Sequence, residues 1–277
     1  MSYVSDVLPA GARHREVAGL AAVEHGPVGV AHGTVLLLPG FSGSKEDFGP
    51  LLGPLATAGW RTVALDLRGQ HDSPHPTDAD GCSVAALADD VLAVLEVIDG
   101  PVHLVGHSFG GLVARRVVLR RPDAVASLVL MASGPEALRG PRVEVLAFLP
   151  ALIETGGMRA VADASAALGS VDRLGRPLSD EVRDFLHHRW TSTSPATVLG
   201  MAAALVAEPD LVAELRATGV PVLVLHGEAD DAWSPQVQRE MAERLGSAYA
   251  VVPASVHCPA AENPAATAAA LLGFWHR

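Results

Sequence analysis

Residues 102–111, which are the most informative about the fold, read Val102-His-Leu-Val-Gly106-His-Ser108-Phe-Gly110-Gly111. The apolar run Val102–Gly106 predicts a buried strand, and Gly110–Arg121 predicts a helix with a cationic last turn. Between them lies a G-x-S-x-G pattern, in the strand–turn–helix context in which a sharp turn presents a serine. Five-residue patterns also arise by chance, but the flanking strand and helix favour a functional turn. Ser108 is therefore the candidate nucleophile.

Five further short apolar runs predict strands. Unbroken runs of this kind are typical of parallel strands that are buried on both faces. They are Thr34–Leu38, Arg61–Leu65, Val125–Met131, Val220–His226 and Ala248–Val252. Helical patterns alternate with them, including Val84–Val97 and two helices that begin at Ser234-Pro235 and Asn263-Pro264. The alternation predicts an α/β fold with a mostly parallel central sheet flanked by helices.

Residues 134–218 break the alternation, because they contain only predicted helices. These are Val143–Ile153, Met158–Leu168, Ser179–Trp190, Ser194–Val206 and Leu211–Ala217. We expect a helical cap, residues 134–218, inserted into a core made of residues 1–133 and 219–277. The N-terminal segment is expected to add an antiparallel edge pair with its turn at Glu24-His25-Gly26-Pro27.

A nucleophilic serine needs a base, and the base needs an acid that orients it. For a serine on this kind of turn the chain order is serine, acid, histidine. Only His257 and His276 follow the last predicted strand, and His276 is the penultimate residue at a helix end. His257 lies in an irregular loop after a strand and is the candidate base, with an ordinary loop histidine as the alternative.

The acid should follow a strand between the serine and the histidine. The run Val220–His226 continues into Gly227-Glu-Ala-Asp230-Asp231. We prefer Asp230 as the orienting acid, with Asp231 as the alternative and Glu136, after the preceding strand, as a third candidate.

Acyl chemistry also needs hydrogen-bond donors for a developing oxyanion. We expect these to be the backbone N–H of Phe109, which follows the nucleophile, and that of Phe41, in the turn Pro39-Gly40-Phe41-Ser42-Gly43. The alternative is that Gly40 and Gly43 only shape this turn, and the two roles are compatible.

These residues together resemble the α/β-hydrolase superfamily, over nearly the whole chain and in its capped, esterase-like form. The resemblance rests on Pro39-Gly40-Phe41, Asp66-Leu-Arg68-Gly69, Gly106-His-Ser-Phe-Gly110, Gly227-Glu-Ala-Asp230, and His257 with Glu262-Asn263-Pro264. It implies a catalytic triad of Ser108, Asp230 and His257. The chain departs from the family with Pro39 where His is usual and with His71 where Gly is usual, which implies a differently shaped loop at His71.

Four aromatic residues are candidates for the substrate pocket: Phe148, Phe185, Trp190 and Trp233. For the three in the cap, packing inside the cap is the alternative. His107 is expected to pack and to hydrogen-bond, and Cys258 is not expected to act as a nucleophile. The pair His187-His188 predicts no metal site, because adjacent positions of a helix face different directions.

Composition narrows the possible partners. The net charge of −11 disfavours nucleic acids and anionic membranes, whose binding relies on Lys and Arg. Residues 1–15 lack a signal-peptide pattern, no apolar run approaches membrane-spanning length, and two cysteines, Cys82 and Cys258, favour a reducing compartment. We expect a cytoplasmic protein that acts on a small molecule. No pattern implies a metal, flavin or nicotinamide cofactor, and Gly106–Gly110 lacks the G-x-G-x-x-G spacing.

The leading hypothesis is a serine hydrolase that cleaves a small, mostly apolar ester, thioester or lactone. One alternative is hydrolysis of a carbon–carbon bond in a diketone-like or ring-cleavage product, which would use the same triad. Another is a ligand-binding member of the fold without turnover, which the intact set of triad residues disfavours.

Overall fold

The computed structural model describes residues 8–168, 171–172 and 174–276. One sheet holds eight strands in the order β1-β2-β4-β3-β5-β6-β7-β8. The pairs β4–β3, β3–β5, β5–β6, β6–β7 and β7–β8 are parallel, and only β1 and β2 run antiparallel to their neighbours. The predicted α/β fold with a mostly parallel sheet is confirmed.

The strands lie close to their predicted positions. Three predictions match: β3 (Thr34–Leu38), β4 (Arg61–Leu65) and β8 (Ala248–Val252). The others are β1 (Arg13–Val17), β2 (Leu20–His25), β5 (Val102–His107), β6 (Ser127–Met131) and β7 (Val222–Gly227). Every residue of β3, β6 and β7 is buried, as expected for strands covered on both faces.

The N-terminal edge pair is antiparallel as predicted, but its predicted turn at residues 24–27 is wrong. The chain reverses at Ala18-Gly19, where Val17 pairs with Leu20. Ala18 and Gly19 both have positive φ, 48° and 81°, which is the backbone of a two-residue hairpin turn that matches the strand twist. Glu24 pairs with Val63 of β4 instead, because β2 continues as a strand of the main sheet.

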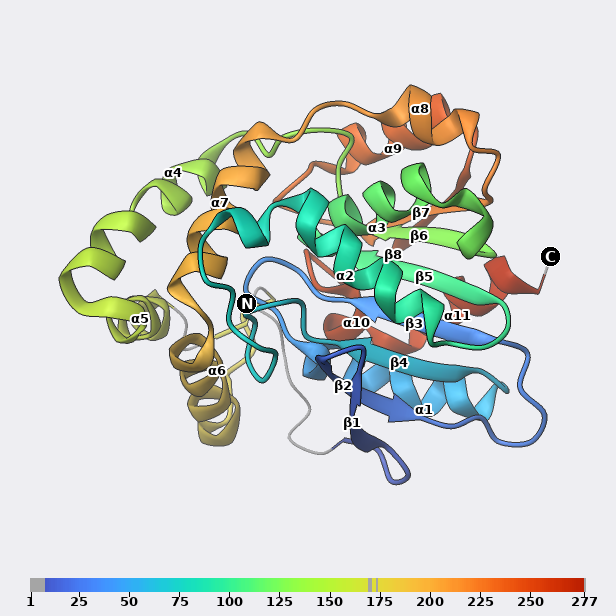
Figure 1. The fold of residues 1–277 in the computed structure, drawn as a ribbon, viewed down its shortest axis with the longest axis horizontal. Coiled ribbons are helices and arrows are strands. Elements are labelled where there is room, and N and C mark those ends of the chain that lie inside the picture. The colour runs from blue at the N-terminus through green and yellow to red at the C-terminus, as the bar shows by residue number, and fades with distance from the viewer. Residues whose placement is uncertain (1–7, 169–170, 173, 277) are drawn as a thin grey trace.

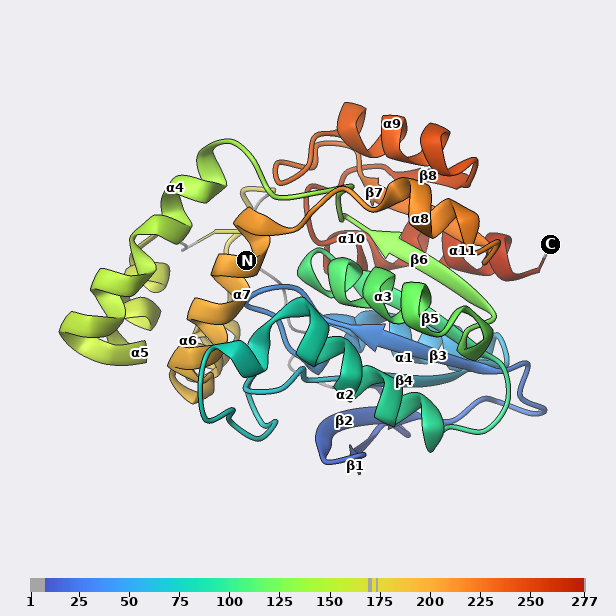
Figure 2. The same ribbon diagram turned by 45° about the horizontal axis from the view of Figure 1, so that its top comes forward.

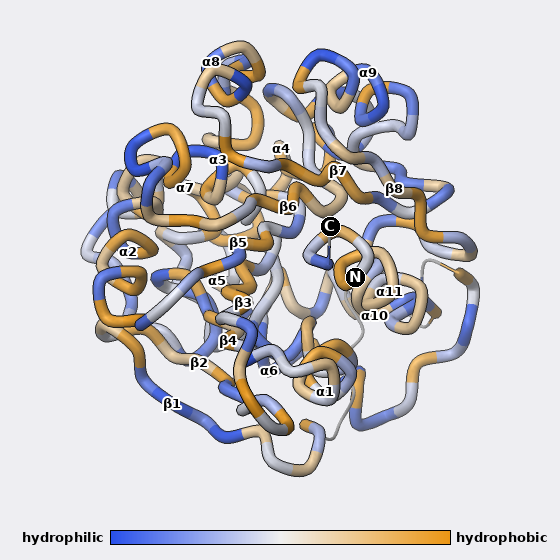
Figure 3. The backbone as a smooth tube through the Cα atoms, turned by 90° about the vertical axis from the view of Figure 1, so that its right-hand side faces the viewer, coloured by the Kyte–Doolittle hydropathy of each residue, from blue (hydrophilic) through white to orange (hydrophobic). Residues whose placement is uncertain are grey.

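Helices cover both faces of the sheet. One face packs against α2 (Val84–Glu96), α3 (Phe109–Arg120), α8 (Val212–Ala217) and α9 (Pro235–Leu245), and the other against α1 (Gly49–Thr57), α10 (Pro259–Glu262) and α11 (Pro264–Trp275). Figure 2 shows α2 and α3 in front of the sheet and α1 behind it. Figure 3 shows that the residues of the central strands β6 and β7 are mainly hydrophobic, whereas those of the edge strand β1 are mainly hydrophilic. The two side-chain cores therefore hold the sheet rigidly between helical layers.

The chain between β6 and β7 forms α4 (Pro141–Ala147), α5 (Leu149–Leu168), α6 (Asp180–Ser192) and α7 (Pro195–Ala207) before α8. Figure 1 shows α4 to α7 gathered beyond one end of the sheet. The predicted helix 143–153 is split at Phe148, since Pro150 lies in the first turn of α5, where proline is tolerated. Within α5, Gly157 is non-helical (φ 62°, ψ −161°).

The division into a core and a cap stays a prediction. The described part of 134–218 contributes no strand to the sheet, and residues 1–7, 169–170, 173 and 277 of the expected units lie outside the described residues. Among the described helices, none alone has the length and hydropathy to cross a membrane. The bent pair α4 and α5 passes that test only when the two are joined, across a 59° bend. The expected cytoplasmic location also stays a prediction.

Candidate active site

Ser108 lies at the turn between β5 and α3, with φ 51° and ψ −116°. This backbone region costs a non-glycine residue about 1–3 kcal/mol and persists only where the surroundings impose it. A Cβ atom on Gly106 would overlap the Gly110 carbonyl, and one on Gly110 would overlap the Leu38 carbonyl. Both flanking positions therefore need glycine. The amide of Ser108 donates to the Met131 carbonyl at 2.8 Å, which ties the turn to β6.

Ser108, His257 and Asp230 lie within hydrogen-bonding distance of one another in series. His257 Nε2 lies 3.0 Å from Ser108 Oγ, and His257 Nδ1 lies 2.9 Å from Asp230 Oδ1. All three side chains are more than nine-tenths buried. They come from the loops after β5, β7 and β8, which meet because the carboxyl ends of parallel strands lie at one edge of the sheet.

Asp230 is held by two further donors. Ala232 N–H donates to Oδ1 at 2.9 Å, and the Gln238 amide donates to Oδ2 at 2.9 Å. Burial raises the pKa of Asp230 to about 6, while both hydrogen bonds oppose that rise. Sequence reasoning missed Gln238. The predicted helix start at Ser234-Pro235 would have placed it one turn into α9, beside the acid.

The two other candidate acids form pairs with arginines, although Asp231 also lines the cavity beside His257. Asp231 pairs with Arg142 of α4, and its side chain is half exposed. Glu136 lies 3.7 Å from Arg139 at the surface.

Two residues hold the loop that carries His257. His107 Nε2 lies 2.7 Å from the His257 carbonyl, so this nitrogen is the N–H donor. The Glu262 carboxylate accepts from Ser255 Oγ (2.7 Å), Val256 N–H (2.6 Å) and Cys258 N–H (3.1 Å). The base loop is thus fixed from both sides.

Two backbone N–H groups lie beside the serine. Those of Phe41 and Phe109 donate to no described residue. Gly40, between β3 and Phe41, approaches the turn closely, since a Cβ there would lie 3.2 Å from Ser108 Cβ. The expected role of these two groups as oxyanion donors stays a prediction.

Ser108 and His257 open into a cavity of about 670 Å³. Its wall is mostly apolar and is built largely from the inserted helices; it includes Leu138, Leu146, Leu149, Leu152, Val161 and Leu205. Phe148, Trp190 and Trp233 line this cavity, with Phe148 67% exposed at its rim.

The expectation that Phe185 lines the cavity is wrong. On α6, Leu186, Arg189 and Trp190 line the cavity, whereas Phe185 lies at the edge of that face, under the Arg189 guanidinium. Its ring packs 5.4 Å from that of His71 instead. His71 itself has φ 41°, so it adopts the left-handed conformation that glycine favours, and the expectation of a differently shaped loop stays a prediction.

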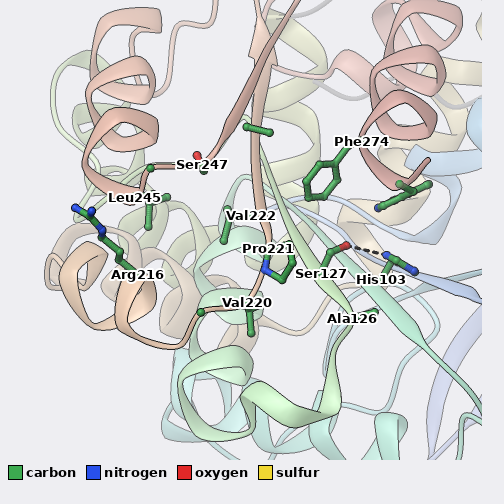
Figure 4. Close-up of a pocket in the computed structure, with 14 residues that line it drawn as sticks. His103, Ala126, Ser127, Arg216, Val220, Pro221, Val222, Leu245, Ser247 and Phe274 are labelled. Atoms are coloured by element: carbon green, nitrogen blue, oxygen red, sulfur yellow. Dashed lines mark hydrogen bonds between the residues drawn. The ribbon is translucent and has the colours of Figure 1, made fainter. Parts of the chain in front are cut away.

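A second cavity of about 680 Å³ lies near the amino ends of the strands (Figure 4). Its lining includes His103 and Ser127, 2.8 Å apart, with Arg216 and Phe274. His103 stands near the start of β5, at the opposite end from Ser108. The described lining residues contain no carboxylate, so no serine–histidine–acid series can form there.

Two groups of described side chains have metal-ligand spacing. One is Asp230, Asp231 and His257, where both nitrogens of His257 are already hydrogen-bonded. The other is Glu46, His71 and Asp72. There the Lys45 ammonium lies 2.9 Å from Glu46 and 2.7 Å from Asp72, in the place of a cation. Neither arrangement favours a metal centre.

Known proteins are similar to this chain in sequence and in fold. The profile of a family described as "alpha/beta hydrolase fold" matches residues 33–264. The chain is 28% identical over 251 residues to a "Pimeloyl-[acyl-carrier protein] methyl ester esterase" of Neisseria meningitidis, covering 87% of this chain and 92% of that protein. It is 46% identical over 109 residues to the "Putative carbamate hydrolase RutD" of Variovorax paradoxus, which covers only 40% of that relative.

The fold also matches solved structures. The enol-lactonase from Burkholderia xenovorans LB400 superposes with a TM-score of 0.77 at 23% identity, covering 96% of this chain and all of that one. At this identity the match speaks for the fold.

Proposed function

This chain belongs to the α/β-hydrolase family, and we propose that it is a serine hydrolase that cleaves a small, mostly apolar ester, thioester or lactone through an acyl-enzyme. One observation carries the proposal: Ser108, His257 and Asp230 form a hydrogen-bonded series at the base of an apolar cavity.

The first step in this proposal is attack by Ser108 Oγ on the substrate carbonyl carbon. His257 Nε2, 3.0 Å away, accepts the hydroxyl proton as the carbon–oxygen bond forms. The imidazolium keeps its Nδ1–H on Asp230, whose negative charge stabilises it and fixes the tautomer. Asp230 must be ionised for this role.

The carbonyl oxygen becomes an oxyanion when the tetrahedral intermediate forms. The N–H groups of Phe41 and Phe109 donate to it, and Phe109 stands at the positive end of α3. When the intermediate collapses, the bond to the leaving group breaks and His257 returns the proton to that group.

Water completes the cycle. His257 takes a proton from water, the hydroxide attacks the acyl carbon, and the second tetrahedral intermediate releases the acid and regenerates the Ser108 hydroxyl. Every proton that leaves Ser108 or water returns through Nε2 of His257, so no cofactor is required.

The cavity supports the proposed substrate class. A volume of about 670 Å³ lies in the usual range for small-molecule sites, and leucine and valine side chains dominate its wall. We propose that α4 to α7 act as a cap, so that their apolar side chains bind the acyl or alcohol portion. The Neisseria relative is also named for an ester, a methyl ester carried on an acyl carrier protein.

A fluorophosphonate probe tests the proposal. It should label Ser108 in the folded protein and abolish hydrolysis of nitrophenyl esters. Ser108→Ala should prevent both, whereas Ser127→Ala, which changes a buried serine in the second cavity, should preserve both. Absence of labelling at Ser108, or turnover of a vinylogous diketone in preference to every ester, would overturn the proposed activity.

A further inference from the structure

Gln70 is fully buried beside the candidate oxyanion turn, and the mechanism above does not use it. It lies in the loop after β4. Its amide donates to the Gly40 carbonyl at 2.7 Å, and its side-chain oxygen accepts from Leu67 N–H at 3.0 Å. The flipped amide would set oxygen against oxygen and N–H against N–H, so these two partners fix the orientation of Gln70.

The Gly40 carbonyl determines where the Phe41 N–H points. The two groups belong to one peptide unit, which is planar, and in the trans form they point in opposite directions. Gln70 from one loop and Gly43 N–H, at 3.1 Å, hold the carbonyl away from the cavity. The Phe41 N–H is therefore turned toward the cavity, where Gly40, Phe41 and Ser108 all line the wall.

Among the described residues, the Gly40 carbonyl accepts hydrogen bonds from Gln70 and Gly43. Gly40 has no side chain, and the only side-chain donor to its carbonyl among the described residues is Gln70. Removal of Gln70 would leave a buried carbonyl with one donor in place of two and would let the peptide rotate. An oxyanion donor is effective only when it is aimed before the charge develops.

We propose that Gln70 is a positioning residue for the oxyanion site, holding the Gly40–Phe41 peptide so that the Phe41 N–H meets the developing oxyanion. This inference rests on the proposed serine hydrolysis. It assigns Gln70 an effect on the transition state and not on substrate binding, because the oxyanion exists only after Ser108 has attacked.

Gln70→Met tests it, since methionine matches the length of glutamine and cannot donate. We expect kcat to fall at least about ten-fold, up to the roughly 10²–10³-fold cost of losing a whole oxyanion donor, with KM nearly unchanged. Affinity for a trifluoromethyl ketone, which forms a tetrahedral oxyanion on the serine, should fall by a similar factor. Affinity for the matching methyl ketone should not.

Ser73→Ala is the matched control from the same loop. Ser73 is buried and bonds the backbone at Asp66 and Ala21, but it does not contact the oxyanion turn. It should lose stability without the selective loss of trifluoromethyl ketone affinity. A Gln70→Met enzyme with kcat within two-fold of wild type, or with equal losses for both ketones, would overturn the inference.

Gln70→Glu keeps the test decisive if the methionine variant does not fold. A protonated carboxyl can donate to Gly40, whereas the carboxylate repels it, so kcat should fall relative to wild type between about pH 6 and 9. A profile parallel to wild type would contradict the role of Gln70. Lack of ester hydrolysis and of probe labelling in the wild-type enzyme would instead refute the proposed function itself.

Discussion

Exchanging Asp230 for Asn should abolish most activity, while the same exchange at Asp231 should not. Asp230 Oδ1 accepts from both His257 Nδ1 and Ala232 N–H, and Oδ2 accepts from Gln238. Asparagine has only one oxygen for these three donors. With its NH₂ at the Oδ1 position it faces two donors, and His257 must then take the tautomer whose Nε2 cannot accept the serine proton.

The opposite amide orientation is also unfavourable. It places the NH₂ against the Gln238 amide, which is held in turn by its 2.7 Å bond to the Trp233 carbonyl. In a serine triad the wrong tautomer costs about 10⁴ in kcat, equivalent to about 5.4 kcal/mol. Asp231→Asn removes the charge from the half-exposed pair with Arg142, for which about 0–1 kcal/mol, or at most about five-fold, is expected.

The assay is steady-state hydrolysis of a nitrophenyl ester by both variants, with circular dichroism and thermal melting to show that both are folded. The reverse pattern would move the orienting acid to Asp231. Equal, mild losses would point to Glu136 or refute the triad.

Three further perturbations probe other parts of the account. Burial raises the pKa of Asp230 to about 6, and His257 must be neutral to accept the serine proton. We therefore expect kcat/KM to rise with pH through about 6 to 7 and then to level off. A kcat/KM that is constant from about pH 5 to 9 would contradict this. Arg189→Met removes the buried ion pair in which Arg189 Nη1 lies 2.8 Å from Asp47 Oδ1. It should lower the free energy of unfolding by about 3–5 kcal/mol, because the Asp47 carboxylate stays buried. A decrease below about 1 kcal/mol in urea unfolding would refute this. Gly106→Ala should abolish probe labelling of the serine, because the new methyl group overlaps the backbone of the turn; normal labelling would disprove that steric argument.

The parts of the fold that follow local patterns could be predicted from the sequence. Short apolar runs predicted β3, β4 and β8 to the residue, although only β3 among them is buried at every position and β8 is a partly exposed edge strand. The helix α1 was not predicted, since Gly49-Pro50 and Pro54 argue against a helix. It forms because Leu51, Leu52 and Leu55 are buried against the sheet, which no local pattern reveals.

In the candidate active site, too, residues with a local sequence signal could be predicted, whereas those that depend on tertiary contacts could not. Ser108, Asp230 and His257 could be identified because each follows a predicted strand and the chain order is restricted. Gln70 could not, since its partner Gly40 is 30 residues away in the sequence. Gln238 was missed, although the predicted start of α9 places it near Asp230. Phe185 was assigned to the cavity because aromatic character alone does not reveal which face of α6 a residue occupies.

Detection of an acyl-enzyme on Ser108 would establish the proposed covalent mechanism. A nitrophenyl ester is mixed with enzyme, quenched in acid during a single turnover, and analysed by intact-mass and peptide mass spectrometry. We predict a burst of nitrophenol equal to the enzyme concentration and an acyl adduct on Ser108. Turnover without an adduct on Ser108, or with undiminished rate in Ser108→Ala, would contradict the account.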